Sequence, residues 1–138
     1  MEVLNSAPLL STAKENVDPS TCLTAPFTAI YFSAHWCPPC RSFTPVLSMF
    51  YEEANKDGKQ IEIVFVSSDQ NQASFEAYFG EMPWKAVPFG DERVGKLKSQ
   101  FNVTGIPKLV VLGKDGNVVS ENGRMDVANL GVGALKKW

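Results

Sequence analysis

Two cysteines separated by two prolines, Cys37 and Cys40 in the segment WCPPC, are the residues of this chain best suited to chemistry. A pair of thiols at this spacing can bind a metal ion, close a structural disulfide or exchange electrons with the thiols of another molecule. The chain has only three cysteines, the third being Cys22, which is too few for a framework of structural disulfides. We therefore weigh a redox-active pair against a metal site.

The expected position of Cys37, directly after a strand and at the start of a helix, favours nucleophilic chemistry. Unpaired backbone N–H groups and the positive end of the helix dipole meet at this position, and both stabilise a thiolate relative to a thiol. Cys40 follows one helical turn later, where it would be shielded and could attack a mixed disulfide formed at Cys37. The spacing predicts Cys37 as the nucleophile and Cys40 as the resolving thiol.

The residues around the cysteines favour redox chemistry over zinc binding. Pro38 suits the first helical turn, because its missing N–H would have no partner there. Thiolate ligands of zinc are usually steadied by hydrogen bonds, and two intervening prolines remove two nearby donors. Cys22, His35, Cys37 and Cys40 could supply four ligands, but His35 and Cys37 are spaced more closely than ligand pairs of tetrahedral zinc. We expect no metal site.

Apolar periodicity predicts the elements that position the cysteines. Runs of β-branched and aromatic residues at 27–32, 61–67 and 109–112 predict buried strands. Apolar residues three and four apart predict three helices. These residues are Phe43, Val46, Leu47, Phe50, Tyr51 and Ala54; then Phe75, Tyr78, Phe79 and Met82; then Val94, Leu97 and Phe101.

Polar residues and turn signals mark the ends of several elements. Asp69 and Asn71 are candidate caps for the second helix, and Asp91 is a candidate cap for the third. The segment GKDGNVV predicts a hairpin with an Asp-Gly turn. Asp126 could then cap a final helix.

The order strand, helix, strand, helix, helix, hairpin, helix predicts an α/β domain. The initial strand–helix–strand unit implies a parallel pair, and the late hairpin adds antiparallel neighbours, so the sheet should be mixed. A further edge strand could lie around residues 2–10. The length of 138 residues and the hydrophobic content of 44% fit a single domain over residues 1–138.

The charge pattern and the N-terminal residues limit the classes of function. Thirteen basic and fifteen acidic residues are interspersed, so no basic surface is expected for nucleic acid or for a membrane. The first 20 residues lack the basic head and apolar stretch of a signal peptide, and no later run is long enough to span a membrane. We expect a cytoplasmic protein, and structural disulfides are rare in that compartment.

Two segments resemble the tryparedoxin and nucleoredoxin branch of the thioredoxin superfamily. They are YFSAHWCPPCRSFTP at residues 31–45 and YFGEMPWKAVPF at 78–89; GIP at 105–107, before the late strand, resembles the whole superfamily. The resemblance covers the chain from about Phe27 onward. It implies the thioredoxin fold, a central mixed β-sheet flanked by helices on both faces. It also implies a thiol–disulfide oxidoreductase that acts in cell redox homeostasis and needs no bound cofactor.

The resemblance also implies roles for residues around the cysteines. Pro107 would be cis, which would leave the backbone of Ile106 free to pair with an extended substrate. Trp36 would form a partly exposed platform beside the sulfur. Arg41 and Arg124 would pair with carboxylates of a glutathione-like donor. The expected substrate-binding residues are Trp36, Pro39, Arg41, Ile106, Pro107 and Arg124.

Other residues depart from the pattern or have simpler interpretations. Thioredoxins carry a buried aspartate six residues before the first cysteine, and Tyr31 stands there in this chain. A different proton route is therefore expected, through water or through a carboxylate such as Asp69. We expect Cys22 to be a small buried apolar residue, His35 to be exposed without a role, and Trp84 to pack a loop against the core.

The resemblance also suggests partners. The donor of electrons would be a low-molecular-weight dithiol such as trypanothione, or a reductase, and the acceptors would be disulfides of proteins such as peroxiredoxins. We expect a monomer that binds neither nucleic acid nor membranes. Two alternatives stay open. One is a non-catalytic binding module that uses the GIP edge, and the other is a tethered or exported reductase, which would need an N-terminal anchor.

Overall fold

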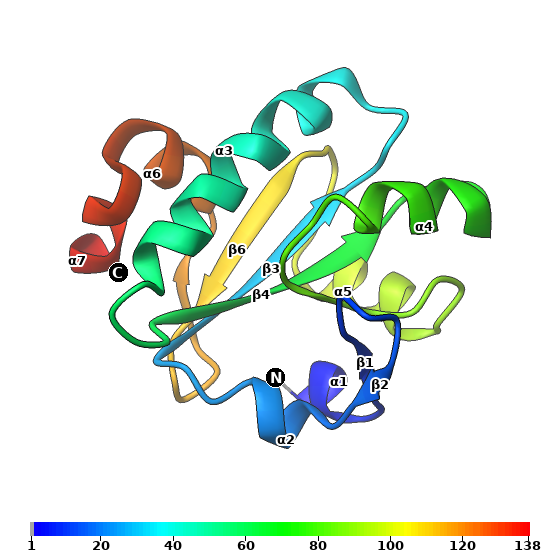
Figure 1. Cartoon of the computed structure of the whole chain (residues 1–138), viewed down its shortest axis with the longest axis horizontal. Coiled ribbons are helices and arrows are strands. Elements are labelled where there is room, and N and C mark those ends of the chain that lie inside the picture. Colours follow the sequence, from blue (N-terminus) through cyan, green and yellow to red (C-terminus); the bar gives the residue numbers. More distant parts are fainter. Residues whose placement is uncertain (1) are drawn as a thin grey trace.

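The computed structural model describes residues 2–138, which form a mixed sheet with helices on both faces (Figure 1). Its strands run in the order β2-β1-β5-β4-β3-β6-β7. They are β1 (Leu9–Leu10), β2 (Asn16–Val17), β3 (Phe27–Ser33), β4 (Ile61–Ser67), β5 (Lys85–Ala86), β6 (Lys108–Leu112) and β7 (Val118–Ser120). The helices are α1 (Glu2–Asn5), α2 (Pro19–Cys22), α3 (Pro38–Ala54), α4 (Gln72–Phe79), α5 (Arg93–Gln100), α6 (Gly123–Leu130), the 3₁₀ turn η1 (Gly131–Gly133) and α7 (Ala134–Lys137).

The centre of the sheet is β3, which is parallel to β4 and antiparallel to β6. All three of these strands are almost continuously buried, because helices cover both of their faces. The predicted thioredoxin fold with a mixed sheet is therefore confirmed, as are the three central strands. The hairpin is confirmed too: β6 and β7 are antiparallel, and Gly116 in the connecting turn has a φ of 85°.

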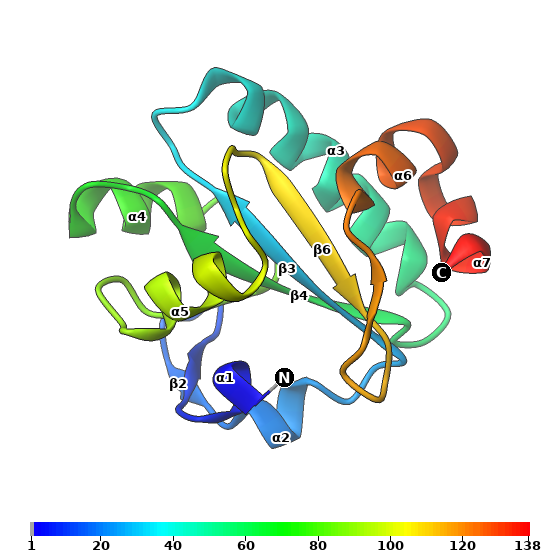
Figure 2. The same ribbon diagram turned by 180° about the vertical axis from the view of Figure 1, so that it is seen from behind.

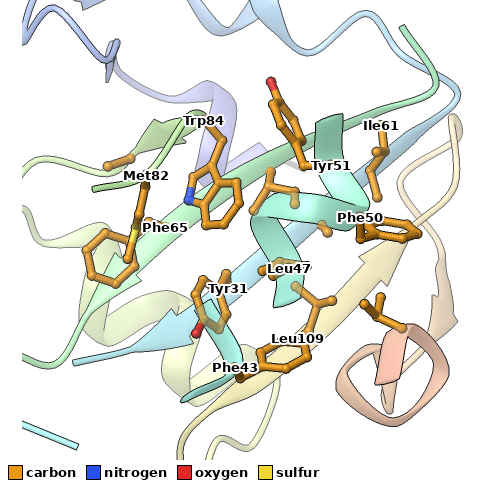
Figure 3. Packing of buried hydrophobic residues seen from close by; sticks show 14 of the residues in the cluster. Tyr31, Phe43, Leu47, Phe50, Tyr51, Ile61, Phe65, Met82, Trp84 and Leu109 are labelled. Carbon is orange, nitrogen blue, oxygen red and sulfur yellow. The ribbon is translucent and has the colours of Figure 1, made fainter. Parts of the chain in front are cut away.

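Side chains that alternate along β3 build two separate hydrophobic cores. Tyr31 points into the core under α3, α4 and α6, whereas Ile30 and Phe32 point into the core under α1 and α5. Figures 1 and 2 show these two layers from opposite sides of the sheet. In the first core Trp84 is fully buried against the rings of Tyr31 and Tyr51, as expected for a residue that anchors a loop (Figure 3).

The predicted helices form, with differences at their ends. Asn71 caps α4 as expected, since its side chain accepts the Ser74 N–H at 2.8 Å. Met82 lies after the end of α4 at Phe79, although it is still buried in the first core. Val46 is 43% exposed, because α3 is covered by the sheet on only one side. The buried apolar face of α3 is therefore narrower than the sequence suggested.

Neither of two acidic residues predicted as caps lies at the N-cap position of its helix. Asp126 does not begin a helix, because α6 already starts at Gly123. Its buried carboxylate instead accepts hydrogen bonds from the side chains of Ser120, Lys137 and Trp138, and so ties α6 to the C-terminal residues. Asp91 lies one residue before the N-cap position of α5 and accepts the backbone N–H of the first helical residue.

The N-terminal residues extend the sheet, but not as one long strand. Residues 2–5 are helical, and of the edge strand expected around residues 2–10 only Leu9–Leu10 forms a strand, which lies inside the edge because β2 pairs with its outer side. The buried guanidinium of Arg93 holds this segment by donating hydrogen bonds to the carbonyls of Leu4, Ala7 and Pro8. A long-range anchor of this kind leaves no periodic signal in the sequence.

Candidate active site

Cys37 stands at the N-cap position of α3, with Pro38 and Pro39 in the first turn of the helix. The loop from β3 places it there, and its N–H donates to the Ala34 carbonyl at 3.2 Å. Its side chain makes no capping hydrogen bond, which leaves the sulfur available at the positive end of the helix. The structure thus places Cys37 where the sequence predicts the nucleophile.

The sulfur atoms of Cys37 and Cys40 are free thiols that lie 2.6 Å apart. Cys40 is fully buried and Cys37 is 5% exposed, so a substrate can reach only Cys37. Burial, followed by the hydrogen bond with Cys37, raises the pKa of the Cys40 thiol to about 11. Cys40 is therefore protonated at neutral pH and has to lose its proton before it can attack.

The turn before β6 faces the dithiol. The Ile106–Pro107 peptide bond is cis, which confirms the expectation for this turn. The Cys37 sulfur lies 3.9 Å from the Ile106 carbonyl oxygen, and the Ile106 side chain packs against the small buried cluster that Ala34, Cys37 and Cys40 form. The backbone of the residue before the proline is therefore beside the reactive sulfur.

The end of β4 fixes the loop that carries the cysteines. Trp36 is 57% exposed, and its indole N–H donates to the Ser68 carbonyl at 3.0 Å. The Asp69 carboxylate accepts the His35 N–H at 2.8 Å and the Ser67 hydroxyl at 2.7 Å. In the structure Asp69 thus holds the loop, a role that sequence reasoning missed because His35 and Asp69 are 34 residues apart along the chain.

A pocket of about 530 Å³ opens beside the dithiol and is called the His35 pocket here; His35, Arg41, Thr44, Tyr78 and Glu81 are among the residues that line it. The His35 ring is half-buried and stacks on the ring of Tyr78, with 5.3 Å between the centroids. The prediction of an exposed His35 is therefore wrong, because α4 places the ring of Tyr78 against the His35 ring.

The structure separates the two candidate arginines. Arg41 lines the His35 pocket, whereas Arg124 lines a second pocket of about 290 Å³ together with Pro107. The guanidinium of Arg124 lies 6.0 Å from the centroid of the Phe43 ring. The expected substrate-binding residues therefore surround the dithiol on two sides, and Pro39 is exposed beside them.

Four hydroxyl groups lie under Cys40, and we call them the hydroxyl cluster: Tyr31, Ser33, Thr44 and Tyr78. All four residues are buried. Sequence reasoning noticed only Tyr31, where the superfamily has an aspartate. The sequence does not show that the other three hydroxyls belong to this cluster. Tyr78, for example, fits the apolar face of a helix that is remote from the cysteines in the sequence.

Cys22 lies away from the active site. It is half-buried against the core on the other face of the sheet, and burial, followed by the charge of Glu62, raises the pKa of its thiol. Within residues 2–138, the structure brings together no group of three or more His, Cys, Asp or Glu residues that could hold a metal ion. The four-ligand set weighed from the sequence is thus not assembled.

The comparisons with known proteins agree with this geometry. A family model described as thioredoxin-like matches residues 27–118. The chain belongs to the thioredoxin-like family. Nucleoredoxin of Danio rerio is 45% identical to this thioredoxin-like chain over 125 residues, which cover 90% of the chain and 30% of that protein. The chain thus spans about 30% of the length of the vertebrate nucleoredoxins it matches and 16% of the length of probable nucleoredoxin 1 of Arabidopsis thaliana.

Solved structures place the thioredoxin-like chain in the same branch. Tryparedoxin I from Crithidia fasciculata is 37% identical, with a TM-score of 0.87, and the match covers 96% of this chain and 92% of that one. Tryparedoxin II complexed with glutathionylspermidine is 34% identical, with a TM-score of 0.80, and the match covers 90% and 86%. The resemblance to tryparedoxins and nucleoredoxins is therefore confirmed, and with it membership of a family of redox proteins.

Proposed function

We propose that this chain is a thiol–disulfide oxidoreductase of the tryparedoxin and nucleoredoxin type, which reduces disulfides of other proteins. The observation that carries the proposal is the pair of sulfurs 2.6 Å apart, with Cys37 at the start of α3 and Cys40 fully buried behind it. A nucleophile and a shielded resolving thiol are the two groups that this reaction requires.

The proposed reaction has two exchanges. The Cys37 thiolate attacks one sulfur of the substrate disulfide, forming a mixed disulfide, and the other substrate sulfur leaves as a thiolate that takes a proton from water. Cys40 then loses its proton and attacks the Cys37 sulfur. The bond between Cys37 and the substrate breaks, the second substrate thiolate leaves, and a Cys37–Cys40 disulfide remains. Two electrons have passed to the substrate, and an external thiol donor restores the dithiol.

The surroundings of Cys37 support binding of an extended substrate. The Ile106 backbone next to the sulfur offers pairing that does not depend on substrate sequence, and the exposed Trp36 offers an aromatic surface. Arg41 and Arg124, on two sides of the dithiol, suit carboxylates of a donor related to glutathione. The solved tryparedoxin II complex holds glutathionylspermidine, which supports a low-molecular-weight thiol as donor.

The wider setting is part of the same proposal. The acceptors are protein disulfides such as those of peroxiredoxins, the donor is a trypanothione-like dithiol or a reductase, and the protein works in the cytoplasm as a monomer. In residues 2–138 no helix has the length and apolar character needed to cross a membrane.

A trapping experiment tests this function. Cys40→Ser should still form the mixed disulfide but lack the thiol that releases it, so that substrate proteins accumulate on Cys37. Cys37→Ser is the matched control and should trap almost nothing, since Cys40 is buried and protonated. The trapped proteins are eluted with a reductant after incubation of each variant in a lysate of the source organism.

The outcomes separate an enzyme from a binding module. Proteins linked covalently to the Cys40→Ser variant, together with reduction of insulin by the native chain and dithiothreitol, support the oxidoreductase. Equal capture by the two variants contradicts the assigned roles. Capture that persists without any covalent bond, in a chain that does not reduce insulin, indicates a binding module.

A further inference from the structure

The resolving step of the proposed reaction needs a route for a proton. Cys40 is fully buried, and burial raises the pKa of its thiol to about 11. The mixed disulfide at Cys37 would cover it further. Asp69 is the carboxylate that the sequence suggested as a proton acceptor. In the structure it accepts hydrogen bonds from the backbone N–H of His35 and from the Ser67 hydroxyl, so it does not face Cys40 as a free acceptor.

The hydroxyl cluster forms a continuous set of hydrogen bonds beside this thiol. The Ser33 hydroxyl lies 2.7 Å from the Tyr78 hydroxyl, which lies 2.6 Å from the Thr44 hydroxyl. The Tyr31 hydroxyl lies 2.7 Å from that of Thr44. In each of these three pairs either oxygen can act as the donor, so the direction of the hydrogen bonds can reverse.

One end of the cluster is attached to Cys40. The Cys40 carbonyl oxygen lies 3.0 Å from the Thr44 hydroxyl and 3.4 Å from the Tyr31 hydroxyl, and it accepts from whichever of the two does not donate within the cluster. The Ser33 hydroxyl lies near the Cys40 thiol, where it acts against the rise in the pKa of Cys40 that burial causes. A hydrogen bond from a hydroxyl favours a thiolate because it stabilises the charged form.

The other end of the cluster reaches solvent. Tyr78 and Thr44 both line the His35 pocket, which is open to water. The charged and titratable groups around this path come from each neighbouring element. They are Cys37 and Arg41 of α3, Tyr31 of β3, Tyr78 of α4, Glu81 after α4, and His35 and Asp69 of the two adjoining loops.

We propose that Ser33 and Tyr78 relay the proton of Cys40 to the His35 pocket, while Thr44 and Tyr31 hold the Tyr78 hydroxyl in place. The thiol proton moves to the Ser33 oxygen as Ser33 passes its own proton to Tyr78, and Tyr78 passes its own to water in the pocket. Each hydroxyl ends neutral, one proton reaches solvent, and Cys40 is left as the thiolate that attacks Cys37. This inference rests on the proposed thiol–disulfide exchange and assigns its missing proton route.

Ellman's reagent separates the two exchanges in one experiment. Attack by Cys37 releases one thionitrobenzoate, and attack by Cys40 on the resulting mixed disulfide releases a second. Stopped-flow absorbance between pH 6 and pH 10 gives the rate of each phase. The variants are Ser33→Ala and Tyr78→Phe. Tyr51→Phe is the matched control, because it removes another buried tyrosine hydroxyl from the same core, one that bonds to Glu62.

The relay predicts a change in the second phase alone. Without the Ser33 hydroxyl the pH midpoint of that phase should rise by about one unit, which slows it about tenfold at pH 7. Tyr78→Phe should shift it in the same direction by less, and Tyr51→Phe should leave both phases unchanged. At the highest pH the variants should approach the native rate, since solvent hydroxide then removes the proton.

Each other outcome overturns the relay. If the pH midpoint of the second phase is the same in Ser33→Ala and in Tyr78→Phe as in the native chain, the hydroxyls carry no proton. An equal slowing of both phases at every pH shows a structural role only, and melting temperatures measured for all variants check the fold. If the native chain shows no second phase at all, the proposed exchange itself is wrong, which is a different result from failure of the relay.

Discussion

Replacing Asp69 tests how far the active site depends on the loop that carries Cys37. The Asp69 carboxylate is 8% exposed and accepts two hydrogen bonds, from the His35 backbone and from the Ser67 hydroxyl. Asp69→Ala removes both acceptors. The Ser67 hydroxyl can turn to another partner, but the His35 N–H is fixed in direction and loses its hydrogen bond.

The expected loss of stability follows from these two bonds. A hydrogen bond to a charged group contributes about 1.5–3 kcal/mol. Because the Ser67 hydroxyl can turn to another partner, Asp69→Ala should lower the free energy of unfolding by about 1.5–3 kcal/mol, which is the contribution of the bond from His35. Asp69→Asn keeps one acceptor oxygen and should lose about half as much. Insulin reduction should also slow several-fold in Asp69→Ala, because the loop that orients Cys37 is less well ordered.

Urea unfolding and the insulin assay measure the two effects. Asp115→Ala is the matched control: that carboxylate also accepts a hydrogen bond from a backbone N–H, but it is exposed in the hairpin turn. It should leave the stability and the activity nearly unchanged. An Asp69→Ala variant as stable and as active as the native chain would refute the role of this carboxylate.

Three further predictions concern the fold that supports the site. Burial raises the pKa of Asp126, but hydrogen bonds from Lys137, Trp138 and Ser120 outweigh this effect and lower the pKa to about 2. The ionised carboxylate should therefore stabilise the fold above about pH 4, by up to about 2 kcal/mol. That stability should disappear as the pH falls from 4 to 2 in urea unfolding of the native chain, and much less so in Asp126→Asn. Arg93→Met should cost about 3 kcal/mol and expose the N-terminal segment to limited proteolysis, because three backbone carbonyls lose their donor; resistance equal to that of the native chain would contradict the anchor. Gly123→Ala should destabilise by about 1–3 kcal/mol, because the new Cβ would lie 2.9 Å from the Leu109 carbonyl oxygen, whereas Gly95→Ala, with open space around it, should be neutral or stabilising in the same thermal melts.

Local patterns in the sequence were sufficient for the centre of the fold. The strands at 61–67 and 109–112 could be predicted because buried strands are continuous in apolar residues, and α3 because its apolar residues follow the helical period. The two-residue strands β1, β2 and β5 are too short to show any period. They depend on pairing with neighbours, which no local pattern reports.

The residues of the candidate site likewise divide into those that a local sequence pattern predicts and those that it does not. Cys37 and Cys40 could be proposed as the reactive pair because thiol–disulfide exchange requires two cysteines at one spacing, which fits within a single turn of helix. The hydroxyl cluster could not be predicted, because Ser33 and Tyr78 meet only after β3 and α4 pack together. Asp69 was considered as a proton acceptor and instead holds a loop, since hydrogen bonds to the backbone of a remote residue leave no signature in the sequence.

The lengths of the outermost strands bear on how this molecule avoids aggregation. Unpaired N–H and C=O groups along the edge of a sheet can pair with another chain and start a growing β-structure. In residues 2–138 one edge is β2, with two residues, and the other is β7, with three. The long strands β3 and β4 are enclosed between neighbours. Val118 and Val119 on β7 are 44% and 41% exposed, so the hairpin edge is the side on which added lysines would do most for solubility.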